Sequence, residues 1–337
     1  MLALHIFLLV LGFALLVKGA DWFVDGSAGI AGKCKISPLV IGLTVVAFGT
    51  SAPELAVSIT SAIQKSTDIS IGNVVGSNIC NILLILGLAA LFHPLPVQKN
   101  SLRLDLPVLL LASALLVGLG VWGNALEWWD GLILLAVFAV YMFILIRGAV
   151  KEQKKAKALE IEVPREEPTP EKKPKGRIGQ WFEKMEEHTW FLVVLAIVGL
   201  AMVVGGGTLL VDSAREIANF FHVPERIIAL TVVAIGTSLP ELVTSVVAAA
   251  KGETDIAVGN IIGSNIFNIF LVAGAASLFH PLAFSLEANL VDALVAFAAA
   301  ALLTVLALFK GHKLGKLSGA IMLACFVGYY VYLFVAM

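Results

Sequence analysis

Ten long apolar segments dominate this chain and limit its possible folds more than any other feature. Each approaches the roughly 20 mainly apolar residues that a helix needs to cross a membrane. Inside a bilayer every backbone polar group must pair within the protein, so segments of this length favour helices. We therefore predict an all-α membrane protein with ten transmembrane helices. The expected spans are 2–31, 39–63, 70–91, 103–122, 128–148, 189–218, 226–250, 257–279, 289–309 and 316–336.

The composition agrees with a polytopic membrane protein. Hydrophobic residues make up 59% of the 337 and charged residues 14%, whereas soluble domains carry about 25% charged residues. With a net charge of −1 and no basic patch, nucleic-acid binding is not expected. The three cysteines have no metal-ligand or disulfide spacing. The sequence indicates the lipid bilayer as its surroundings and no bound cofactor or protein partner.

The ends of the chain and its one long hydrophilic stretch suggest a topology. Residues 2–17 lack a preceding basic region, so we expect a retained first helix rather than a cleaved signal peptide. Residues 151–188 mix Lys, Glu and Pro, which is typical of a solvated linker, and separate five spans in 1–150 from five in 189–337. Lys and Arg gather in this linker and in loops on its side. The linker should therefore be cytoplasmic, with both termini outside.

The two halves are related by a repeat. Shifting the sequence by 187 residues matches 23 of the 39 positions of 43–81 with 230–268, without a gap. Because each half holds an odd number of spans, the second half should enter the membrane from the opposite side. Inverted repeats of this kind place a binding site near the middle of the membrane, where interrupted helices meet.

The strongest match includes a polar string within an apolar span. Thr50, Ser51 and Glu54 lie three or four residues apart, so they share one helix face. Pro53 lacks an N–H group and disturbs the preceding turn, which should open the backbone around 47–50 and free carbonyl oxygens as ligands. An ionisable residue at membrane depth costs about 2.5–3.5 kcal/mol on insertion scales and usually marks a functional site.

The next span adds polar groups of the same kind. Gly72 and Gly76 leave a small face for close helix approach, and Ser77 and Asn81 follow on one side. The second half repeats the arrangement with Thr237, Ser238, Glu241, Ser264 and Asn268. Four further amides could either bridge helices or support this site: Asn73, Asn78, Asn260 and Asn265.

Together these residues offer carboxylate, amide, hydroxyl and carbonyl oxygens, without thiol or imidazole. Such hard ligands suit Ca²⁺ or Na⁺ and disfavour Zn²⁺ or Cu. Two glutamates around one Ca²⁺ are formally neutral, which lowers the cost of holding the charge within the bilayer. The pattern therefore predicts a cation site shared by the two halves.

The paired strings GTSAPEL…GNVVGSNICN and GTSLPEL…GNIIGSNIFN resemble the two alpha-repeats of the calcium/cation antiporter superfamily, in particular its prokaryotic sodium/calcium exchanger branch. The resemblance implies ten helices, of which the first and sixth slide against the other eight. It also implies four cation sites in a diamond and a location in a prokaryotic inner membrane. The ligands it implies are Glu54, Glu241, Thr50, Ser51, Thr237, Ser238, Ser77 and Ser264, with the carbonyl groups of Ala47 and Ala234.

One difference from the family concerns the counter-ion. Some members carry an Asp where this chain has Asn81 or Asn268; here both are Asn, so the site holds two acids rather than three. The best interpretation is a secondary antiporter that exchanges Ca²⁺ for Na⁺. A Ca²⁺/H⁺ antiporter is the alternative, and a cation channel is less favoured because the repeat is inverted. We expect no enzyme, since neither a positioned nucleophile nor a metal cage is evident.

Overall fold

The computed structural model describes residues 2–162, 188–221, 236–287, 289–309 and 311–336. This part of the chain is helical except for four strands of two residues each. Eight of its helices are long and apolar enough to cross a membrane, and one bent helix pair raises the number to nine. The expected span 226–250 is described only in its second part, as α13 (Leu239–Ala250). An all-helical membrane protein is confirmed, with eight or nine described spans.

The helices follow the expected spans closely. The first half contains α1 (Leu2–Cys34), α2 (Pro38–Ile41), η1 (Gly42–Val46), α3 (Ala47–Thr50), α4 (Ala52–Ile63), α5 (Thr67–Ile79), η2 (Cys80–Leu86), α6 (Gly87–Phe92), η3 (Ser101–Asp105), α7 (Leu106–Gly123) and α8 (Trp128–Glu162). The second contains α10 (Thr189–Phe220), α13, α14 (Thr254–Phe267), η5 (Asn268–Ala273), α15 (Gly274–Ser277), α16 (Leu290–Leu308) and α17 (Lys316–Ala336). The η elements are π-helical turns that continue the neighbouring α-helices.

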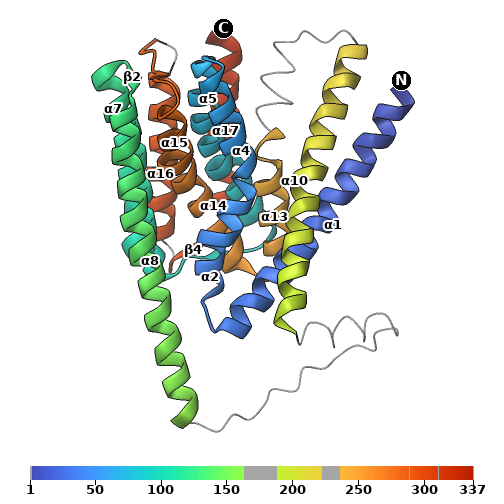
Figure 1. The fold of residues 1–337 in the computed structure, drawn as a ribbon, viewed down its shortest axis with the longest axis vertical. Coiled ribbons are helices and arrows are strands. Elements are labelled where there is room, and N and C mark those ends of the chain that lie inside the picture. Colours follow the sequence, from blue (N-terminus) through green and yellow to red (C-terminus); the bar gives the residue numbers. More distant parts are fainter. Residues whose placement is uncertain (1, 163–187, 222–235, 288, 310, 337) are drawn as a thin grey trace.

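The helices run between two faces of the molecule. Both chain ends lie at the upper end of Figure 1, which we call the termini face. The end of α8 and the start of α10 lie at the lower end, which we call the linker face. Helix α8 continues into the hydrophilic stretch as far as Glu162. The linker therefore begins as a helical extension of the fifth span.

Two short antiparallel ribbons join the halves, one at each face. Near the linker face β1 (Leu95–Pro96) pairs with β4 (Lys313–Leu314), and near the termini face β2 (Ala125–Leu126) pairs with β3 (Leu282–Ala283). Each ribbon thus takes one strand from each half. The sequence did not predict these strands, because a strand of two residues is too short to show the alternation of apolar and polar residues that is typical of β-structure.

Helices α5–α6 and α14–α15 form the centre of the bundle. Their most apolar windows are 78% and 94% buried, compared with 17% for α1. Chains of Val, Ile and Leu from these segments make the core, while the outer helices expose apolar side chains. The spans that carry Ser77, Asn81, Ser264 and Asn268 are therefore the most enclosed of the described spans, a pattern that suits a site inside the protein.

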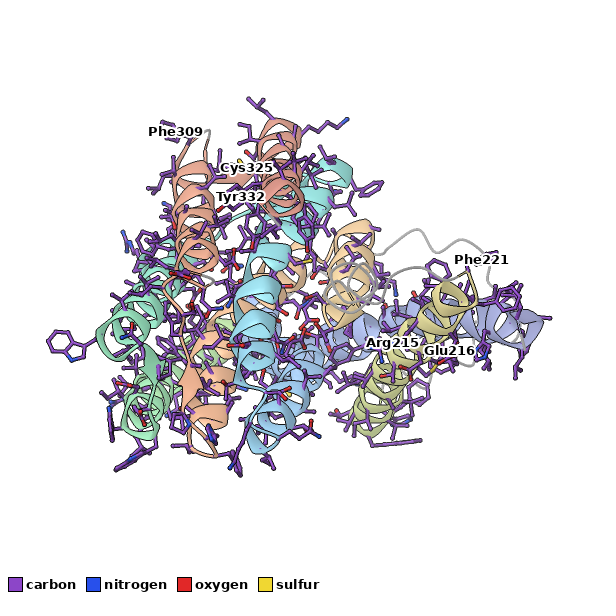
Figure 2. The ribbon with its side chains drawn as sticks, turned by 90° about the horizontal axis from the view of Figure 1, so that it is seen from above. Arg215, Glu216, Phe221, Phe309, Cys325 and Tyr332 are labelled. Atoms are coloured by element: carbon purple, nitrogen blue, oxygen red, sulfur yellow. The ribbon has the colours of Figure 1, made fainter. Side chains whose placement is uncertain are left out.

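Helices α1 and α10 form a separate pair at one side of the bundle (Figure 2). They touch through glycines seven residues apart: a Cβ atom at Gly19 would lie 2.8 Å from the carbonyl oxygen of Gly199, and one at Gly12 would lie 2.9 Å from that of Gly206. Small residues let membrane helices approach this closely. The pair meets the remaining helices mainly through α13, α2 and α3.

Candidate cation site

Two helix interruptions of the same shape create the site. The segments Pro38–Thr50 and Ala52–Ile63 meet at an angle of 45°. Ser51 between them has φ −83° and ψ 4°, and Ser238 before α13 has φ −87° and ψ 5°. In both halves a proline occupies the first turn of the following helix, where its missing N–H group has no intrahelical role. The first half therefore bends at Ser51, and Ser238 has the same backbone conformation at the start of α13.

The bend lies slightly later than the proline alone suggested. The stretch 47–50 remains helical, and the Ala47 carbonyl accepts a hydrogen bond from the Ser51 amide at 3.0 Å. The opening falls at Ser51 because Pro53 is tolerated inside the first turn of a new helix. A carbonyl oxygen has a second lone pair, so Ala47 keeps acceptor capacity. Ala234, its expected counterpart, lies outside the described residues.

The bends bring Glu54 and Glu241 to the first turns of α4 and α13, where both are completely buried. The positive end of a helix dipole favours a carboxylate at this position. Glu241 Oε1 accepts hydrogen bonds from the Ser51 hydroxyl at 3.2 Å and from the Ser264 hydroxyl at 3.5 Å. One carboxylate of the second half is thus held by a serine of the first.

Two amides, the buried Asn260 and the half-buried Asn73, connect the halves in the same way. Asn260 donates to the Ser245 hydroxyl at 2.9 Å, and its Oδ1 atom accepts the Thr50 hydroxyl at 3.0 Å. In the first half Asn73 donates to Ser58 at 3.0 Å and to the Glu54 carbonyl at 3.2 Å. Each amide therefore braces its own half and holds a threonine from the other.

The contact between Asn73 and Thr237 completes this symmetry, with the Thr237 hydroxyl 3.4 Å from Asn73 Oδ1. By contrast, Asn78 and Asn265 donate within their own helices, to the carbonyls of Val74 and Ile261. The sequence left open whether these four asparagines bridge helices or support the site. In the structure, Asn73 and Asn260 bridge helices, and Asn78 and Asn265 bond to their own helix.

Asn81 and Asn268 lie in the π-helical turns η2 and η5. Element η2 packs against α13, and η5 packs against α4, so each amide belongs to a turn beside the glutamate helix of the opposite half. Turns of this kind interrupt the regular backbone pairing and are frequent at functional sites. The sequence predicted both residues but gave no sign of the π-helical turns.

Many polar atoms in this region are buried and form no hydrogen bond with protein groups. Buried polar atoms are normally paired, and an unpaired one costs about 1–3 kcal/mol. The set includes both carboxylate oxygens of Glu54, Glu241 Oε2, the hydroxyls of Ser77 and Ser238, and the side-chain amide groups of Asn81 and Asn268. These polar atoms, gathered beside the two glutamates, mark a site that water or a cation can fill.

The expected residues therefore fall into two groups. Printed contacts bring together Thr50, Ser51, Glu241 and Ser264, with 3.4 Å between the Thr50 and Ser264 hydroxyl oxygens. The second group is buried in neighbouring turns without hydrogen bonds between its members: Glu54, Ser77, Asn81, Ser238 and Asn268. The described residues contain no group of three or more His, Cys, Asp and Glu side chains that could hold a metal.

Comparison with known proteins agrees with this geometry. The family described as sodium/calcium exchanger protein matches residues 4–147 and again 191–335. The two matches cover most of the chain and correspond to its two halves. This chain belongs to the sodium/calcium exchanger family. The family is one of membrane transporters rather than enzymes.

Relatives and solved structures match over nearly the whole length. A putative antiporter, CaxA, from Alkalimonas amylolytica is 39% identical over 99% of both chains. The sodium/calcium exchanger MaX1 from Methanosarcina acetivorans is 34% identical over 99% of both. A structure of the sodium-calcium exchanger NCX_Mj, soaked with Na⁺ and Ca²⁺, superposes with a TM-score of 0.81 at 34% identity, covering 98% of this chain and 99% of that one.

Proposed function

We propose that this protein is a secondary antiporter that exchanges Ca²⁺ for Na⁺ at a site in the middle of the membrane. The observation that carries the proposal is the pair of completely buried glutamates, Glu54 and Glu241, three of whose four carboxylate oxygens have no hydrogen-bond partner. Two ionised carboxylates that are buried at membrane depth with so few hydrogen bonds have a large unfavourable energy unless a cation binds between them. The relatives named as sodium/calcium exchangers support the choice of ions.

The cargo follows from the chemistry of the ligands. Ca²⁺ takes six to eight oxygen ligands in flexible geometry, and the surrounding oxygens meet that demand. In the proposed site the ligands are Glu54, Glu241, Thr50, Ser51, Thr237, Ser238, Ser77, Ser264, Asn81, Asn268 and the carbonyls of Ala47 and Ala234. One Ca²⁺ neutralises both carboxylates.

Coupling arises because both ions need the same two carboxylates. Ca²⁺ and Na⁺ cannot occupy these oxygens together, so the protein crosses between its two states with one load or the other. A pair of unneutralised buried carboxylates disfavours the crossing with an empty site. This scheme requires alternating access, in which the site opens to one face at a time.

The topology proposed with this function has ten spans in two inverted halves, residues 1–150 and 189–337, joined by a linker at 151–188. The two strand ribbons at opposite faces and the matched bends at Ser51 and Ser238 support this arrangement. The distribution of Lys and Arg supports a cytoplasmic linker face and a cell-membrane location.

Uptake of ⁴⁵Ca²⁺ into proteoliposomes tests the proposal. Vesicles loaded with Na⁺ and diluted into Na⁺-free buffer should accumulate ⁴⁵Ca²⁺, and collapsing the Na⁺ gradient should stop accumulation. If only a pH gradient drives uptake, the protein is a Ca²⁺/H⁺ antiporter instead. Unitary currents in a planar bilayer would indicate a channel.

Two glutamate variants test the site itself. Glu54→Gln and Glu241→Gln remove the charge but keep the shape, so each should reduce exchange to background while the purified protein stays folded. The matched control is Lys172→Gln in the linker, which should transport at the normal rate. Normal exchange in either glutamine variant would refute the assignment of the carboxylates.

A further inference from the structure

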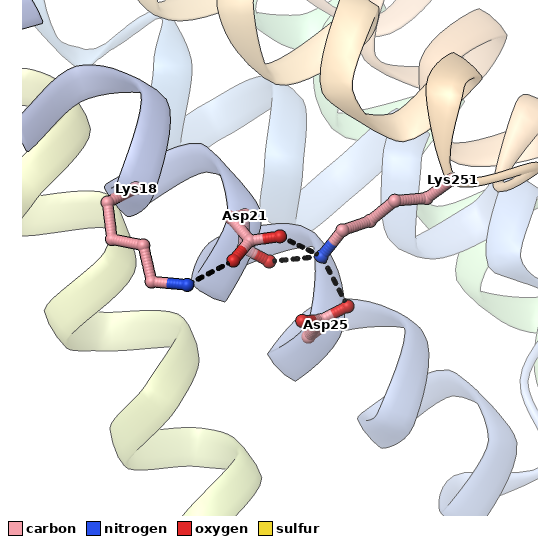
Figure 3. A network of polar contacts seen from close by, with 4 residues as sticks. All are labelled: Lys18, Asp21, Asp25 and Lys251. Carbon is pink, nitrogen blue, oxygen red and sulfur yellow. Dashed lines mark hydrogen bonds and ion pairs between the residues drawn. The ribbon is translucent and has the colours of Figure 1, made fainter. Parts of the chain in front are cut away.

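A lysine outside the cation site joins α1 to the turn between α13 and α14. Lys251 follows α13 in the turn that leads to α14, and its Nζ atom lies 2.5 Å from Asp21 and 2.7 Å from Asp25. It also donates to the main-chain carbonyl of Asp21 at 2.9 Å (Figure 3). All three donors of the ammonium group are used, and all three acceptors belong to α1.

Solvent is only partly excluded from this contact. The Lys251 side chain is only 26% exposed, and those of Asp21 and Asp25 are 32% and 45% exposed. Burial alone would lower the pKa of Lys251, but the hydrogen bonds and charges of the two aspartates raise it above its ordinary value. The lysine therefore remains charged at physiological pH, as the ion pairs require. Lys18, which also pairs with Asp21, is more exposed.

The sequence repeat gives the opposite face a different set of residues. The 187-residue shift places Gln64 at the position of Lys251, Thr208 at that of Asp21, and Asp212 at that of Asp25. At the Asp212 position the structure has a cavity of about 190 Å³ between α10 and the proline turns. The cavity is lined by Asp212, Thr208 and Thr237, so it reaches one of the expected cation ligands.

The cavity and the lysine contact lie at opposite faces. Helix α10 runs from the linker face to the termini face (Figure 1), and Asp212 lies in the last third of this helix, which ends at Phe220. Lys251 meets α1 in the part of that helix near the linker face, where α13 ends. The same position of the repeat therefore borders a cavity in the second half and carries the lysine contact in the first.

We propose that Lys251, Asp21 and Asp25 form a latch that holds the α1/α10 pair against the α13–α14 turn while the cation site is accessible from the termini face. The latch must break before the site opens to the linker face. Because Lys251 follows the helix that carries Glu241, the latch connects the helix pair directly to the site. This inference rests on the alternating access of the proposed function.

Two repeat-related valines report the state of each face. Val211 lines the cavity, whereas Val24, its equivalent on α1, is completely buried. Val211→Cys and Val24→Cys are introduced separately into a chain in which Cys34 and Cys325 are replaced by serine. Their reaction rates with a charged thiosulfonate reagent are measured in detergent buffer that contains Na⁺ and no Ca²⁺, so that the loaded protein can cross between its two states. With the latch intact, Val211→Cys should react fast and Val24→Cys slowly.

Breaking the latch with Lys251→Gln should raise the rate at Val24→Cys and lower that at Val211→Cys. Hydrogen bonds to charged groups contribute enough that the change should be about tenfold or more. Lys251→Arg should keep the original rates, and so should the matched control Lys65→Gln, a lysine in the corresponding turn of the first half.

Unchanged rates at both cysteines in folded, monodisperse Lys251→Gln protein would overturn the proposal. Equal acceleration at both positions would also overturn it, because that result indicates loosening rather than a shift between two states. The readout does not require transport. It therefore separates failure of the latch from failure of Ca²⁺/Na⁺ exchange, which the ⁴⁵Ca²⁺ uptake assay detects independently.

Discussion

Replacing Asn260 with alanine tests whether the amide that bridges the halves prepares the cation site. The substitution removes two buried hydrogen bonds, to Ser245 and from Thr50, at 2.9 and 3.0 Å. At about 1 kcal/mol net for each bond, the variant should lose roughly 2 kcal/mol of stability. The Thr50 hydroxyl has one proton, and its remaining acceptors are the Val46 and Ala47 carbonyls of its own helix. Asn260→Ala should redirect that proton into the helix.

The effect on Ca²⁺ follows from the share of this energy that positions Thr50. If Ca²⁺ binding through Thr50 weakens by about 1 kcal/mol, the half-saturating Ca²⁺ concentration rises roughly fivefold, since 1.4 kcal/mol corresponds to a factor of ten. The assay is ⁴⁵Ca²⁺ uptake as a function of Ca²⁺ concentration, together with thermal unfolding in detergent. The repeat-equivalent variant Asn73→Ala should show a smaller change, because its contact with Thr237 is longer, at 3.4 Å.

A double-mutant cycle decides the matter. In a Thr50→Val background the hydroxyl is absent, so adding Asn260→Ala should change the half-saturating Ca²⁺ concentration by less than about twofold. If the two substitutions instead multiply their separate effects, Asn260 acts independently of Thr50, and the reasoning from the hydrogen bond is wrong.

Two further predictions concern the α1/α10 pair and the latch. Gly199→Val should reduce transport sharply and lower the free energy of unfolding by about 1–3 kcal/mol. Even a Cβ atom at this position would lie 2.5 Å from the Phe23 amide nitrogen. Normal exchange in this variant would contradict the tight packing. Gln64→Lys combined with Thr208→Asp should create a second latch at the termini face and slow the labelling of Val211→Cys, measured as above. Faster labelling would show that the repeat positions are not equivalent.

Much of the fold could be predicted from the sequence because membrane spans depend on length and hydropathy alone. The helices that correspond to the expected spans 2–31 and 128–148 end later than expected, because polar residues continue each helix, as in α8 up to Glu162. The two glutamates, six hydroxyl residues and two amides of the site were recognisable because polar groups are expensive at membrane depth. Their hydrogen-bond partners across the halves were not, because sequence spacing reports neighbours on one helix only.

The remaining features depend on three-dimensional contacts that leave little trace in the sequence. The π-helical turns at Asn81 and Asn268 have the same composition as the α-helices they continue. The partners of Lys251 lie 226 and 230 residues away, so no local pattern indicated them. In the sequence, Lys251 is only one of the positive charges in the loops on the linker side.

The exchange of partners between the halves has a consequence for how the chain is made. Each strand ribbon takes one strand from each half, and Asn73 and Asn260 each hold a threonine from the other half. When the ribosome has completed only the first five spans, Glu54 and Asn73 lie in the bilayer without the groups that later surround them. The first half therefore stays incompletely packed until the second half is inserted. Biogenesis of this protein is a single act of assembly rather than the folding of two successive domains.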